Sequence, residues 1–131
     1  MQTTLTISHM LVRITGVLQL ILGLLMWTEP SFFYVRMPHM VLGVVFVLSL
    51  WVLAAVSTRA GVPIGLAAGV AVLGLVVLVL GVTQTGLMPG SSHWVIQVLH
   101  LLIGMAAIGS GEAIGGRLRR NRLGSARADF L

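Results

Sequence analysis

The 131-residue sequence contains no cysteine, no lysine and only three acidic residues. Without cysteine, the chain can form no disulfide, no thiolate metal site and no iron–sulfur cluster. Charged residues make up 8% of the chain, against about 25% in a soluble domain. A chain with this few charges cannot cover the surface of a soluble globule. We therefore expect lipid to be its solvent.

Long apolar runs account for most of the sequence, which is 57% hydrophobic with a mean hydropathy of +1.05. Each run approaches the ~20 residues that cross a bilayer. In lipid, the backbone of such a run must satisfy its own amides and is therefore helical. The sequence predicts an all-α, integral membrane, up-down four-helix bundle that forms a single domain over 1–131. The expected helices lie at about 8–27, 38–57, 62–85 and 92–116.

Arginine predicts the orientation of the bundle. Arg117, Arg119, Arg120 and Arg122 directly follow the last apolar run, within a basic tail at 117–131. By the positive-inside rule, this tail is cytoplasmic, and four crossings make the N-terminus cytoplasmic as well. We therefore expect a multi-pass protein of the cell (plasma) membrane. A basic stretch directly after an apolar helix is typical of an anchor facing anionic lipid, so we expect no nucleic-acid partner.

Two histidines inside apolar runs share one spacing: "HMVLG" at 39–43 and "HLLIG" at 100–104. Ionisable groups inside membranes are costly and point to function. His39 lies 20 residues before Arg59, and His100 lies 17 residues before Arg117. At about 1.5 Å per residue, the two imidazoles lie at similar heights on helices that run in the same direction. We expect them to face each other across the bundle core.

Two imidazoles at one height can bind a planar metal macrocycle from both faces. Gly43 and Gly104 lie four residues after His39 and His100, on the same helical faces, where they leave surface free of side chains. This arrangement predicts one haem b, with His39 and His100 as the metal ligands.

Two further residues are candidate contacts of this haem. Arg36 lies three residues before His39, and its guanidinium would suit a haem propionate. His93 lies two turns before His100 and is either a propionate partner or an alternative ligand opposite His39. We favour His100 as the ligand, because His93 lies in the wet interface.

Simpler interpretations stay open for each of these residues. Hydrogen bonding between helices would also explain His39 and His100. Polarity at the headgroup level would explain His9 and His93, and we favour it for both. Glu112 is expected in an ion cluster with Arg117, and with His9 and Arg13 of the first helix. Gln19 and Gln97 are expected to meet at the haem level, where they could bond each other, a ligand imidazole or a quinone carbonyl.

The stretches "PHMVLG" (38–43) and "VLHLLIGM" (98–105) give the chain a pattern that resembles small four-helix membrane cytochromes of the b type. The resemblance implies electron transfer, with a quinol as an expected partner, by the chain alone or as an anchor subunit. His9 has no histidine partner at its depth, which favours one haem over two. No catalytic nucleophile, carboxylate pair or nucleotide loop is visible, so we expect an electron-transfer protein or subunit rather than a stand-alone enzyme.

Three other function classes remain at this point. The first is a cofactor-free accessory subunit of a larger membrane complex, or a homo-oligomer. The second is a (bacterio)chlorophyll-binding protein, in which each histidine holds its own magnesium. A transporter is the third, and the scarcity of charges inside the apolar runs argues against it.

Overall fold

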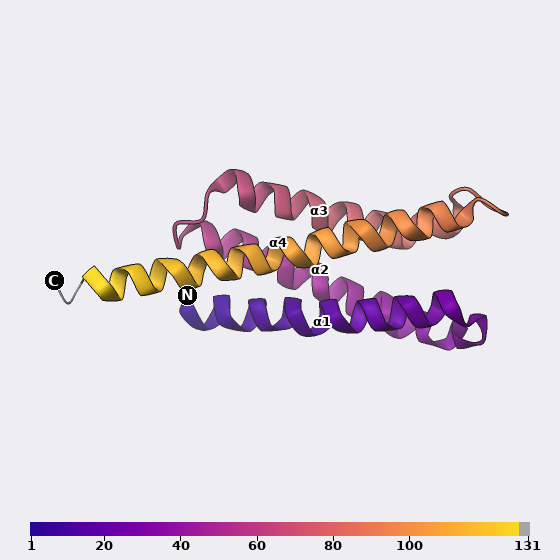
Figure 1. The fold of residues 1–131 in the computed structure, drawn as a ribbon, viewed down its shortest axis with the longest axis horizontal. Helices are drawn as coiled ribbons and strands as arrows, with labels where there is room; N and C mark the ends of the chain where they lie inside the picture. The colour runs from indigo at the N-terminus through magenta and orange to yellow at the C-terminus, as the bar shows by residue number, and fades with distance from the viewer. Residues whose placement is uncertain (129–131) are drawn as a thin grey trace.

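The computed structural model describes residues 1–128 and consists of four long helices packed up and down (Figure 1). The long helices are α1 (Gln2–Thr28), α2 (Arg36–Thr58), α3 (Ile64–Thr83) and α4 (His93–Ala128). Two short 3₁₀ helices, η1 (Pro30–Val35) and η2 (Gln84–Gly86), follow α1 and α3. The predicted all-α, up-down four-helix fold is confirmed.

Each of the four helices is long and apolar enough to cross a membrane. Even α3, with 20 residues, reaches about 30 Å, which is the thickness of the hydrocarbon layer. In the most apolar stretch of α2, 39% of the residues are buried inside the bundle. The corresponding stretches of α1, α3 and α4 have only 17% of their residues buried. The chain is therefore a multi-pass membrane protein with four candidate spans, and α2 is its central helix.

The packed core occupies the half of the bundle that contains the chain's N-terminus. The second half of α2 is at its centre, where Leu50 and Leu53 are fully buried. Val12 of α1, Val70 of α3 and Ile114 of α4 pack around them. The other half of the bundle contains few fully buried side chains, and this difference leaves room there for a cavity.

Trp51 explains how α2 and α3 approach each other closely. Its indole Nε1 donates a hydrogen bond to the Ala71 carbonyl oxygen at 3.0 Å. A Cβ at Gly74 would lie 2.9 Å from the same Nε1, so only glycine leaves room for the indole. Trp51 thus joins two helices inside the bundle.

Helix limits differ from the sequence expectations at two places. Helix α1 begins at Gln2 rather than near Ser8, so the polar start of the chain is helical as well. Helix α4 does not end near Gly116 but continues to Ala128, because arginine is a good helix former. Most of the expected tail at 117–131 is therefore helix, and 129–131 lie outside the described residues.

Candidate functional site

A cavity of about 400 Å³ lies in the half of the bundle away from the core, lined by residues of all four long helices. This volume falls within the range of about 300–1,000 Å³ that ligand cavities occupy. Most of the lining is aliphatic, aromatic, methionine or glycine. Among the described residues, no acidic or arginine side chain lines it. Its polar lining residues are Gln19, His39, Gln84, Gln97 and His100.

His39 of α2 and His100 of α4 face each other at this cavity. Their ring centroids are 6.4 Å apart, with an angle of 62° between the ring planes. The two rings therefore lie close together, as the sequence predicts. A metal ion held by one nitrogen of each imidazole at about 2.0–2.1 Å would set the centroids about 6 Å apart. The observed separation fits such a ligand pair.

Neither ring has its Nδ1 atom satisfied by the protein. The Nδ1 atoms of His39 and His100 are both buried without a hydrogen-bond partner. A metal-free imidazole nitrogen left unpartnered inside a protein costs free energy. A metal ion or another bound group would relieve this cost, so the residues present fit a ligand bound between the rings.

The two histidine rings pack against glycines of the flanking helices α1 and α3. A Cβ at Gly23 of α1 would lie 3.4 Å from Cε1 of His39, and one at Gly81 of α3 would lie 3.3 Å from Cε1 of His100. A larger side chain at either position would push the neighbouring ring. Sequence reasoning missed both glycines, because the chain has sixteen and their spacing relative to the histidines is not regular.

The two glycines predicted from the H-x-x-x-G spacing both line the cavity but differ in their surroundings. A Cβ at Gly104 would have no atom within 4 Å, so this surface is open. A Cβ at Gly43 would lie 2.5 Å from Nε2 of Gln19. Gly43 therefore makes room for the Gln19 amide, whose Oε1 is buried without a partner.

Arg36 and His93, the two predicted propionate contacts, do not line the cavity. Arg36 is exposed at the first position of α2. His93 places its Nδ1 3.1 Å from the Leu87 carbonyl oxygen and so closes the connection before α4. Three glutamines line the cavity. Gln19 and Gln97 were expected near the two histidines, whereas Gln84 was not.

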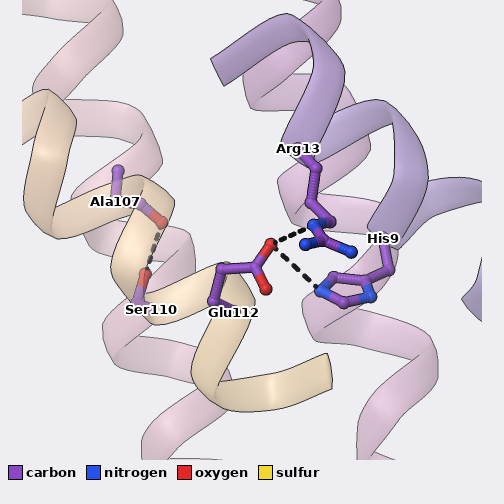
Figure 2. Close-up of polar contacts among 5 residues, drawn as sticks. All are labelled: His9, Arg13, Ala107, Ser110 and Glu112. Carbon is purple, nitrogen blue, oxygen red and sulfur yellow. Dashed lines mark hydrogen bonds and ion pairs between the residues drawn. The ribbon is translucent and has the colours of Figure 1, made fainter. Parts of the chain in front are cut away.

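A second polar cluster joins α1 to α4 at the other end of the bundle (Figure 2). Oε1 of Glu112 lies 3.0 Å from Nε of Arg13 and 3.3 Å from Nε2 of His9. A Cβ at Gly115 would overlap the His9 imidazole, so glycine makes room for that ring. The expected contacts of Glu112 with His9 and Arg13 are confirmed, whereas the expected contact with Arg117 is wrong: within residues 1–128, Glu112 pairs across to α1 and not along α4. This cluster is an interhelical ion pair distant from the cavity.

No protein-family model, curated protein or solved structure matches this chain. The function of this chain must therefore be inferred from the cavity beside His39 and His100.

Proposed function

We propose that the chain is a membrane cytochrome of the b type that binds one haem b between His39 and His100 and relays electrons. The observation that supports this function is the histidine pair, 6.4 Å between ring centroids, at an apolar cavity. In both rings the Nδ1 atom is buried without a hydrogen-bond partner. Each ring also lies against a glycine of a neighbouring helix.

The chain's own residues would fulfil three tasks in this function. His39 and His100 would bind the metal, while Gly23 and Gly81 fix where the two rings lie. The aliphatic walls of the cavity would exclude water. When bound, haem supplies an iron that gains and loses one electron. With His39 and His100 both holding the metal, the group would serve electron transfer rather than catalysis on a bound substrate.

A quinol is the proposed electron-exchange partner. It dissolves in the same apolar phase that surrounds the four candidate spans, so it can reach the bundle from the side. The amides of Gln84 and Gln97 on the cavity wall are hydrogen-bonding groups that a carbonyl or hydroxyl could use. This part of the proposal depends on the haem site.

The ring separation disfavours the chlorophyll alternative. In that alternative, His39 and His100 would each hold a separate macrocycle. Flat carbon frameworks need about 3.5–4.0 Å between neighbouring layers. Two macrocycles with their metals would need more than the 6.4 Å between the ring centroids, whereas a single metal held by both imidazoles needs about 6 Å.

The proposal is tested by expressing the chain with haem supplied and measuring extracted haem per chain. Wild type should bind one haem, and His39→Ala and His100→Ala should each lose most of it. His9→Ala and His93→Ala are matched controls that should keep it, because neither residue lines the cavity. A colourless wild type would contradict the proposal, and constant co-purification with other chains would then favour an accessory subunit. Red or near-infrared absorption would favour a chlorophyll-type pigment.

A further inference from the structure

Four exposed arginines gather at the end of the bundle opposite the cavity. They are Arg59, at the turn after α2, and Arg117, Arg119 and Arg120 of α4, here called the arginine surface. Within residues 1–128, the ion pairs of the structure leave these four without an acidic partner. Glu112, the only acidic residue inside the four candidate spans, already contacts His9 and Arg13.

Packing fixes the α4 extension beside the turn between α2 and α3. Leu118 is only 6% exposed and belongs to the hydrophobic core cluster. Nδ2 of Asn121 donates a hydrogen bond to the Ala60 carbonyl oxygen at 3.2 Å. These contacts hold Arg59 and the arginines of α4 at the same end, where Figure 1 shows α4 extending beyond the other helices.

In a bilayer crossed by the four candidate spans, the arginine surface would lie at the depth of the phosphates. Helix α4 begins at His93, and by Gly116 it has risen about 35 Å, more than the ~30 Å of hydrocarbon. Nη1 of Arg120 lies 3.6 Å from the Cβ position of Gly116. The Arg120 guanidinium therefore folds back by one turn toward the apolar part of the helix, over a residue without a side chain.

We propose that the arginines of this surface bind the phosphates of anionic phospholipids in the leaflet at this end of the bundle. A guanidinium presents paired N–H donors that match phosphate oxygens, and no carboxylate of the described chain competes for them. The depth of these groups favours a lipid phosphate over a dissolved one. The proposal is independent of haem binding, because the arginine surface shares no residue with the cavity lining.

Lipid retention by the purified chain tests this proposal. The chain in detergent is mixed with phosphatidylglycerol or phosphatidylcholine, and bound lipid is counted by native mass spectrometry. Wild type should retain phosphatidylglycerol several-fold better than phosphatidylcholine. The combined variant Arg59→Gln, Arg117→Gln, Arg119→Gln and Arg120→Gln should lose this preference, and excess inorganic phosphate should not displace the lipid.

One control and three further variants make the test decisive. Arg36→Gln removes an exposed arginine at the opposite end and should leave the preference intact. Single Arg59→Gln and Arg119→Gln variants, each with unchanged helical circular dichroism, should lose part of it. Asn121→Ala should also weaken retention by loosening α4 from the Ala60 turn. The proposal is overturned if both lipids are retained equally, if Arg36→Gln has the same effect as the combined variant, or if phosphate displaces the lipid.

Discussion

His39 and His100 are 61 residues apart in the chain, yet their imidazole centroids are 6.4 Å apart at the cavity. The two residues belong to α2 and α4, while the flanking helices α1 and α3 contribute glycines against the rings. The histidine pair therefore depends on all four helices. Changes on α1 or α3 should affect ligand binding even though neither helix supplies a ligand.

Replacement of Gly81 by leucine tests whether the close contact of Gly81 with the His100 ring is needed for haem binding. The Cβ position is already 3.3 Å from Cε1 of His100, so a leucine must displace the imidazole. We expect several-fold less haem per chain in Gly81→Leu. Gly69→Leu on the same helix is the control, because its Cβ position has no neighbour within 4 Å. Equal haem content in the two variants would show that the contact between Gly81 and His100 does not affect haem binding.

Filling the open wall of the cavity should block binding without harming the fold. Gly104 lines the cavity and has no atom within 4 Å of its Cβ position. A phenylalanine there would occupy the space beside His100. We expect Gly104→Phe to bind little haem while it keeps wild-type helical circular dichroism and thermal stability. Gly109→Phe on the exposed side of α4 should bind haem normally, and haem loss in both variants would argue against a ligand at Gly104.

The cluster of His9, Arg13 and Glu112 between α1 and α4 should make the stability of the chain sensitive to a single added methyl group. A Cβ at Gly115 overlaps the His9 ring, so Gly115→Ala must move that ring away from Glu112. Overpacking of this kind costs about 1–3 kcal/mol in unfolding free energy. At the neighbouring Gly116, a Cβ meets only the flexible Arg120 side chain at 3.6 Å. There, alanine should raise stability by about 0.5–1 kcal/mol through helix propensity.

Denaturant unfolding in detergent, followed by circular dichroism, separates these two outcomes. If Gly115→Ala were as stable as Gly116→Ala, His9 would not be packed against α4. Haem content should stay unchanged in both variants, because neither glycine lines the cavity.

Composition and apolar run length were sufficient to predict the four-helix membrane fold, because a chain in lipid must satisfy its backbone within helices. Counting residues from the arginines also predicted the approach of His39 and His100, since helical rise is constant. The contacts of Glu112 with His9 and Arg13 followed from the same reasoning. These features follow from the depth of each residue along its own helix, which the constant helical rise determines.

Features that depend on packing between helices could not be read from the sequence. Gly23 and Gly81 matter only because another helix places a ring against them, and nothing in the local sequence distinguishes them from the other glycines. The continuation of α4 to Ala128 is supported by the contact of Asn121 with Ala60, 61 residues away. The positions of Arg36 and His93 outside the cavity likewise depend on how the ends of α2 and α4 are connected.

The central claim, that His39 and His100 bind one iron together, is tested most directly by electron paramagnetic resonance of the oxidised, haem-loaded protein. Wild type should give a low-spin signal of two imidazole ligands. His39→Gly and His100→Gly should each give a high-spin signal that returns to low-spin when free imidazole is added. A high-spin wild type, or a low-spin signal that persists in either variant without imidazole, would contradict the proposed ligation.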